Sequence, residues 1–118
     1  MTLADFCAHC LSLPHVEETT PFGPEALVYK VGGKMFALAM PDEFPSSVNL
    51  KCDPERAIEL RDRHADIQPG YHMNKRHWNT LILEGRIPTR LVRELIDHSY
   101  QLVTASLTRK VRGELGLT

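Results

Sequence analysis

The chain has 118 residues, of which 42% are hydrophobic and 25% are charged. This is the balance of an ordinary globular protein, so it excludes disorder over most of the chain. No apolar run approaches the roughly 20 residues of a membrane span, and the first residues lack the basic and apolar regions of a signal peptide. We therefore expect a single domain over residues 1–118, no membrane partner and a cytoplasmic location.

Three cysteines are present, Cys7, Cys10 and Cys52, and an odd, sparse count argues against a secreted disulfide scaffold. The Cys-x-x-Cys pair at Cys7 and Cys10 has the spacing of zinc and redox sites, but no second pair supplies further ligands. Both residues fall on the apolar face of a predicted helix, so we expect them to pack in the core. The sequence predicts no metal site and no cofactor.

The first part of the chain predicts a helix followed by strands. Residues 2–13 have apolar side chains on one helical face, and Thr2 is a suitable N-cap. Residues 16–20 predict a short strand. Residues 26–31 and 34–40 predict a β-hairpin, because the two glycines between them supply the positive φ angles that a tight turn needs.

The second part predicts further strands and helices. In chain order they are a strand over 47–51, a helix over 53–63, a short strand near 67, a strand over 78–84, a long helix from 88 and a short helix over 108–115. Asp53 and Pro54 begin the first of these helices as its cap and first-turn residue. Runs of strands between helices favour an α+β fold, in which an antiparallel sheet packs against N- and C-terminal helices.

Charge is distributed unevenly along the chain, although the net charge is −1. Residues 1–69 carry 6 basic and 11 acidic residues, a net of −5, whereas residues 70–93 carry five basic residues and one acidic residue, a net of +4. A concentrated basic stretch on an otherwise acidic chain predicts a local positive patch.

The most unusual segment is Tyr-His-Met-Asn-Lys-Arg-His-Trp over residues 71–78. Cations such as Lys75 and Arg76 bind phosphate oxygens, and aromatic faces stack on bases. Asn74 suits a base edge or a phosphate, but also a turn. The structural alternative is a loop-to-strand junction, in which the cations are solvated and Trp78 closes the sheet onto the long helix.

Seven residues are candidates for binding nucleic acid or another anion: Asn74, Lys75, Arg76, His77, Trp78, Arg86 and Arg90. Arg86, Arg90 and Arg93 lie around the start of the predicted long helix, where cations oppose the helix dipole and an anion would relieve that cost. We expect these arginines to border one patch with segment 71–78. The chain has no nucleophile elbow, phosphate loop or His-Glu-x-x-His motif, so we expect no enzymatic activity and no catalytic residue.

Several stretches resemble the MmcQ/YjbR family of small bacterial proteins. They are His72-Met73-Asn74-Lys75-Arg76-His77-Trp78-Asn79-Thr80, Leu83-Glu84-Gly85-Arg86-Ile87-Pro88, Ser99-Tyr100-Gln101-Leu102-Val103, Ser47-Val48-Asn49-Leu50-Lys51 and Asp53-Pro54-Glu55. The resemblance implies an α+β fold like that of frataxin (CyaY), described as a double wing, and a role in DNA binding. A frataxin would carry an acidic ridge on its first helix, where this chain has only Asp5, so iron binding is disfavoured.

Three hypotheses follow. The first is a monomeric DNA-binding protein of the MmcQ/YjbR type that uses the basic and aromatic patch. The second is a non-enzymatic adaptor or small-anion-binding domain that uses the same residues. The third, an enzyme with His77 and Lys75 as acid/base and electrophile, has the weakest support, because no carboxylate that would orient the histidine is identifiable.

Overall fold

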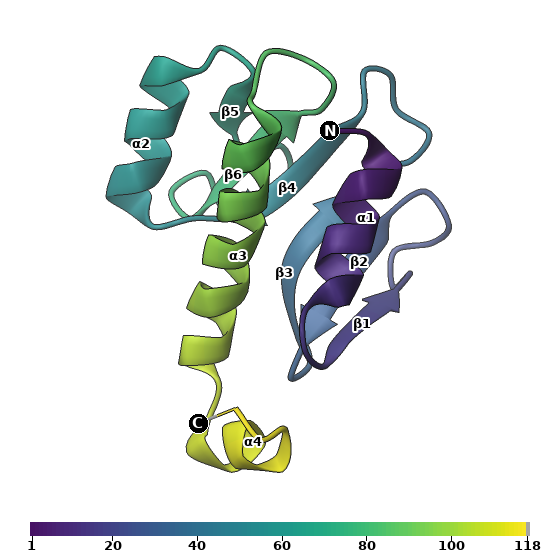
Figure 1. Ribbon diagram of the computed structural model, residues 1–118, viewed down its shortest axis with the longest axis vertical. Helices are drawn as coiled ribbons and strands as arrows, with labels where there is room; N and C mark the ends of the chain where they lie inside the picture. The colour runs from purple at the N-terminus through teal and green to yellow at the C-terminus, as the bar shows by residue number, and fades with distance from the viewer. Residues whose placement is uncertain (118) are drawn as a thin grey trace.

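A six-stranded antiparallel sheet and four helices make up the computed structural model, which describes residues 1–117 (Figure 1). The elements are α1 (Leu3–Ser12), β1 (Val16–Thr19), β2 (Leu27–Val31), β3 (Lys34–Ala39), β4 (Ser47–Lys51), α2 (Pro54–Arg63), β5 (Ile67–Pro69), β6 (Trp78–Ile82), α3 (Thr89–Ser106) and α4 (Arg109–Glu114). The strand order is β1-β2-β3-β4-β6-β5, and every neighbouring pair is antiparallel. The α+β class and the antiparallel sheet are therefore confirmed.

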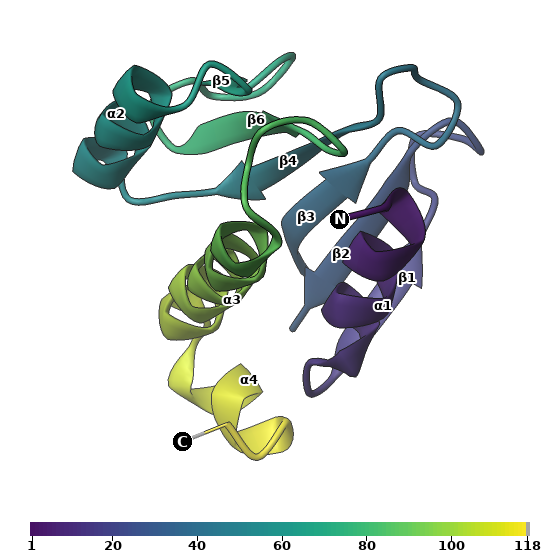
Figure 2. The ribbon, with the colours of Figure 1, turned by 45° about the horizontal axis from the view of Figure 1, so that its top comes forward.

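The helices α1, α2 and α3 pack on one face of the sheet. Helix α1 lies over β1, α3 lies over β3 and β4, and α2 lies over β5 and β6 (Figures 1 and 2). Among the described residues no helix covers the opposite face, which we call the open face. Side chains from the three helices and the sheet form one buried cluster, in which Phe36 and Tyr100 meet edge to face with ring centroids 5.5 Å apart.

Local sequence explains where several elements begin and turn. Thr2 caps α1 as predicted, and its side chain accepts a hydrogen bond from the N–H of Asp5. Asp53 caps α2 in the same way. The hairpin of β2 and β3 turns at Gly32 and Gly33, with φ angles of 59° and 80°, which is the backbone geometry that the pair of glycines predicts.

A bulge in β3 adds a second core residue to that strand. Tyr29 pairs with Ala37 and the next residue of β2 pairs with Met35, so Phe36 is left unpaired between them. As a result both Phe36 and Ala37 reach the core on the helical side. Helix α3 is attached at the same place, because the Ser99 hydroxyl donates to the Phe36 carbonyl at 2.6 Å and accepts from the Lys51 N–H at 3.0 Å.

Cys7 and Cys10 lie on the core side of α1 as their spacing indicates, and Cys52, between β4 and α2, is buried as well. Cys10 is fully buried, Cys7 packs half-buried against the same cluster, and all three cysteines are free. Burial raises the pKa of the Cys10 thiol, and burial raises the pKa of Cys52 to about 11. Thiols held protonated in this way are poor metal ligands and poor nucleophiles at neutral pH.

Candidate nucleic-acid interface

The turn that precedes β6 is built around Asn74. Its side-chain oxygen accepts hydrogen bonds from the N–H groups of Arg76 at 2.9 Å and His77 at 3.3 Å. The carbonyl of His77 in turn accepts from the N–H of Cys52 at 2.8 Å, which fastens the turn to the end of β4. Asn74 therefore acts first as a turn residue, and its turn presents Lys75 and Arg76 at the end of the sheet.

Lys75 and Arg76 extend from this turn in different ways. The Lys75 ammonium group donates to the Gly70 carbonyl at 2.9 Å, so its side chain folds back along the open face. There it lines a shallow groove of about 480 Å³ together with Glu43 and Tyr71. Arg76 is exposed and makes no ion pair with any residue from 1 to 117. Its charge is therefore free to meet an anion from solution.

The side chain of Trp78 lies on the open face. In the β4–β6 pair, Trp78 is opposite Lys51, whereas Asn79 is opposite Leu50, a core residue. The Asn79 side chain points toward the helices and donates to the Ala57 carbonyl of α2 at 3.4 Å. Since side chains alternate along a strand, Trp78 points the other way. The expectation that it closes the sheet onto the long helix is wrong, because it stands one position out of phase with the core residues of β6.

A hydrogen-bonded relay fixes the loop between β5 and β6 onto the open face. The Thr80 hydroxyl donates to the side-chain oxygen of Asn49 on the neighbouring strand and accepts from the Tyr71 N–H at 2.9 Å. The Tyr71 ring lies against the His72 ring, with centroids 4.0 Å apart and planes tilted by 52°. The relay therefore holds a pair of exposed rings on the open face beside the groove that Lys75 lines.

The arginines at the start of α3 belong to a different part of the surface. The backbone N–H of Arg86 donates to Asp66 at 2.7 Å and its guanidinium lies 3.5 Å from the same carboxylate, contacts that lower the pKa of Asp66. Arg90 lies 3.5 Å from Glu94. These residues follow β6, whereas Lys75 and Arg76 precede it, and the two loops lie at opposite ends of that strand (Figure 1).

The expected single patch is thus divided into two. In the first patch, Lys75 and Arg76 lie at the same end of the sheet as Trp78, and Lys51 lies opposite Trp78 on strand β4. Arg86 and Arg90 have carboxylate partners of their own. Sequence reasoning missed Lys51, because nothing local to residues 47–51 shows that this strand pairs with β6 or in which register.

His77, the remaining candidate, is half-buried, and its main chain joins the turn to β4.

Among residues 1–117 no group of three or more His, Cys, Asp and Glu side chains is placed to hold a metal ion. No helix in that range has the length and apolar character that crossing a membrane requires.

Fold and site together define a small α+β protein with one helical face and one open face that carries a basic, aromatic end. The chain belongs to the YjbR family, whose model matches residues 11–102. It is 34% identical over 112 residues to the protein YjbR of Escherichia coli strain K12, a match that covers 95% of each chain. It is 41% identical over 100 residues to YbdF of Escherichia coli O157:H7, covering 85% of this chain and 82% of that one.

Solved structures agree with the fold. The crystal structure of the Deinococcus radiodurans protein DR2400, which carries a DUF419 domain, is 46% identical with a TM-score of 0.92 and covers 99% of this chain and 89% of its own. A crystal structure of a Pseudomonas syringae protein is 28% identical with a TM-score of 0.77, covering 86% and 98%. The comparisons thus establish the family and the architecture.

Proposed function

We propose that this chain is a non-enzymatic nucleic-acid-binding protein of the MmcQ/YjbR type, which binds DNA with the basic end of its open face. One observation carries the proposal. The β4–β6 register sets Lys51 opposite Trp78, next to the turn from which Lys75 and Arg76 extend. Three cations and an aromatic ring from two strands and one loop therefore share one end of the sheet.

The chemistry of this end suits a single strand better than a duplex. Cations bind phosphate oxygens, and aromatic rings on an exposed sheet face stack on unpaired bases whatever their sequence. Tyr71 has 62% of its surface exposed and is held by the Thr80 relay, so it offers a ring that need not be ordered on binding. Arg76 has no competing carboxylate among the described residues.

We further propose that the fold is of the CyaY/frataxin-like, double-wing kind, and that the protein acts as a monomer in the cytoplasm. The support for the fold is the order of elements. A first helix precedes the strands, the long helix α3 follows them, and both pack on the same face of the antiparallel sheet. Fold likeness alone assigns no ligand, so the DNA proposal depends on the surface residues.

A small-anion or adaptor role is the second candidate. The observation that favours it is the groove beside Lys75, which is of the size that small ligands occupy. A single phosphate-bearing metabolite would need only Lys75 and Arg76, whereas a nucleic acid would also engage Lys51 and the exposed rings.

The test is a binding titration of labelled single-stranded and double-stranded DNA by fluorescence anisotropy at two salt concentrations. We expect single-stranded DNA to bind, with log K falling against log[salt] by about 0.7 for each phosphate that is neutralised. The variant Lys75→Ala/Arg76→Ala should lose most of this binding. Its matched control is Arg109→Ala/Lys110→Ala, which removes the same charge from exposed residues of α4.

Other results of this experiment contradict the DNA proposal or favour the small-anion role. No saturable binding at low salt, or equal loss in both double variants, contradicts the proposal. Stabilisation against heat by inorganic phosphate or a nucleotide, without any binding of DNA, favours the small-anion role instead. The variant Arg86→Ala/Arg90→Ala should bind normally, since those arginines lie at the other end of β6.

A further inference from the structure

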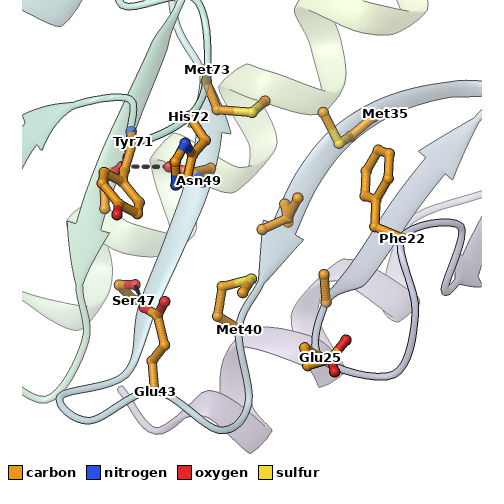
Figure 3. A pocket seen from close by; sticks show the side chains of 13 residues that line it. Phe22, Glu25, Met35, Met40, Glu43, Ser47, Asn49, Tyr71, His72 and Met73 are labelled. Carbon is orange, nitrogen blue, oxygen red and sulfur yellow. Dashed lines mark hydrogen bonds between the residues drawn. The ribbon is translucent and has the colours of Figure 1, made fainter.

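A second hollow on the open face adjoins the groove beside Lys75 and shares Glu43, Ser47, Tyr71 and Thr80 with it, but no lysine or arginine among the described residues lines it. It encloses about 520 Å³ and lies between the loop after β1 and the loop before β6. Figure 3 shows Tyr71 and His72 on one side, Phe22 on the other and Met40 between them. Phe22 and Tyr71 are 68% and 62% exposed, so these rings do not pack in the core and are available to a ligand.

The side chain of Asn49 offers this hollow an N–H donor that is unpaired among the described residues. Asn49 is 7% exposed and lies in the wall of the hollow. Its oxygen is occupied by the Thr80 hydroxyl, and that hydroxyl is occupied by the Tyr71 N–H. No residue from 1 to 117 accepts a hydrogen bond from the Asn49 side-chain nitrogen. This nitrogen is not a buried atom without a partner, so it is open to the hollow and can donate to a ligand oxygen or ring nitrogen there.

The charge of the hollow is negative. Its lining includes the carboxylates of Glu25 and Glu43 but no lysine or arginine. In Figure 3 Glu43 lies on the side of Tyr71 and Asn49, Glu25 lies on the side of Phe22, and Met40 lies between the two carboxylates. Methionine sulfur and aromatic faces are polarisable and attract flat, positively charged groups. The lining thus disfavours anions, although Glu43 also borders the groove beside Lys75.

We propose that this hollow binds a small planar aromatic cation. Its positive charge is attracted by Glu25 and Glu43 on the two sides of the hollow, its rings contact Tyr71, Phe22 and the methionines, and a hydrogen-bond acceptor meets the Asn49 amide. Charge complementarity selects this occupant over a nucleic acid, whose phosphates the two carboxylates repel. The hollow shares Tyr71 with the proposed DNA interface, but Lys51, Lys75 and Arg76 do not line it.

Two dyes with one ring system and opposite charge test the proposal. Rhodamine 123 is a cationic xanthene with an ester carbonyl, and fluorescein is an anionic xanthene. We expect saturable binding of rhodamine 123 by fluorescence polarisation, at least about tenfold tighter than that of fluorescein, because like charges oppose binding. The variant Glu25→Gln/Glu43→Gln should weaken rhodamine 123 by about fivefold, as expected for two exposed charge contacts.

Matched variants separate the site from the rest of the chain. Glu55→Gln/Glu59→Gln removes the same charge from exposed positions of α2 and should leave both dyes unaffected. Asn49→Ala should weaken both dyes by about fivefold, since each carries an oxygen acceptor. Thermal melting shows whether Asn49→Ala folds, and the glutamine pair decides the question if it does not.

Three results overturn the proposal. The first is the absence of saturable rhodamine 123 binding, and the second is equal affinity for the two dyes. The third is a chain that sediments as a dimer, dissociates when Phe22 and Tyr71 are replaced by serine, and leaves rhodamine 123 unbound. That last result assigns the hollow to a second copy of the chain.

Discussion

Lys51 and Trp78 lie directly opposite one another where β4 ends and β6 begins, and strand alternation places both side chains on the open face. This pairing joins a cation to an aromatic ring across 27 positions of sequence, and the turn with Lys75 and Arg76 leads straight into it. The pairing is set by strand register, so the proposed interface is a product of the fold and not of the basic segment alone.

Lys51 should therefore contribute to DNA binding as an individual phosphate contact. We expect Lys51→Ala to weaken binding and to reduce the salt slope by about 0.7, the value for one phosphate on a single strand. Anisotropy titrations at several salt concentrations give that slope. Lys30→Ala is the control, because Lys30 pairs with Glu17 on β1, far along the sheet from Trp78. An unchanged slope for Lys51→Ala removes this residue from the interface.

Ser99 should be one of the most important polar residues for stability. Its hydroxyl joins α3 to both β3 and β4, and it is fully buried. Ser99→Ala leaves the Phe36 carbonyl and the Lys51 N–H without that partner, so we expect a loss of about 2 to 3 kcal/mol in the free energy of unfolding. Urea denaturation measures it. Ser106→Ala on the exposed end of the same helix should cost at most about 0.5 kcal/mol, and equal effects would contradict the assignment.

The two hairpin glycines should tolerate substitution unequally. Gly33→Ala meets no atom within 4 Å, so only its φ of 80° opposes it, and we expect a cost of about 1 kcal/mol. Gly32→Ala adds a clash, because its Cβ would lie 2.7 Å from the Leu107 side chain. We expect about 2 to 3 kcal/mol for that variant. Thermal or urea unfolding compares them, and a smaller loss for Gly32→Ala than for Gly33→Ala would show that Leu107 moves aside.

His98 should make stability depend on pH. Burial, followed by the nearby positive charge of Arg56, lowers the pKa of His98 below its usual 6.5, and its neutral Nε2 accepts the N–H of Asp53 at 3.2 Å. The unfolded chain therefore binds a proton at this residue at a higher pH than the folded chain does. The stabilisation is complete above pH 6.5 and is lost as the pH falls through the lower, folded pKa.

The measurement is the free energy of unfolding between about pH 7.5 and pH 5, a range that spans the ordinary histidine pKa. His98→Gln retains a side-chain acceptor and should lose part of the decline that the native chain shows on acidification. His72→Gln, at an exposed position, is the control and should follow the native curve. A native-like decline in His98→Gln would mean that other groups cause it.

Elements whose signals are local were predictable from sequence. The Gly32-Gly33 turn, the Asp53 cap and the apolar stripe of α3 each depend on residues a few positions apart, and the structure has all three. The arrangement of the site was not predictable in the same way. The direction of Trp78 depends on which residue of β6 pairs with β4, and a shift of one position reverses it. The separation of Arg86 from Lys75 depends on the length of β6 and on Asp66, 20 residues away from Arg86.

The two hollows of the open face were also beyond sequence reasoning, because their linings come from loops and strands distant in the chain. Asn49 and Thr80 are polar residues at strand positions. Only the β4–β6 register shows that Thr80 occupies the side-chain oxygen of Asn49 and leaves its side-chain nitrogen unpaired among the described residues. Segment 71–78 is the part of the sequence that indicated this surface, since its turn, its rings and its cations all contribute to the open face.

The central claim is that single-stranded DNA binds at the end of the sheet where Trp78 lies, and Trp78 is the only tryptophan in the chain. Its intrinsic fluorescence therefore reports on that surface without any label. We predict that an unlabelled oligonucleotide of about 12 nucleotides quenches it saturably at low salt, that added salt reverses the quenching, and that Lys75→Ala/Arg76→Ala abolishes it. Fluorescence that stays constant through the titration at low salt would contradict the account.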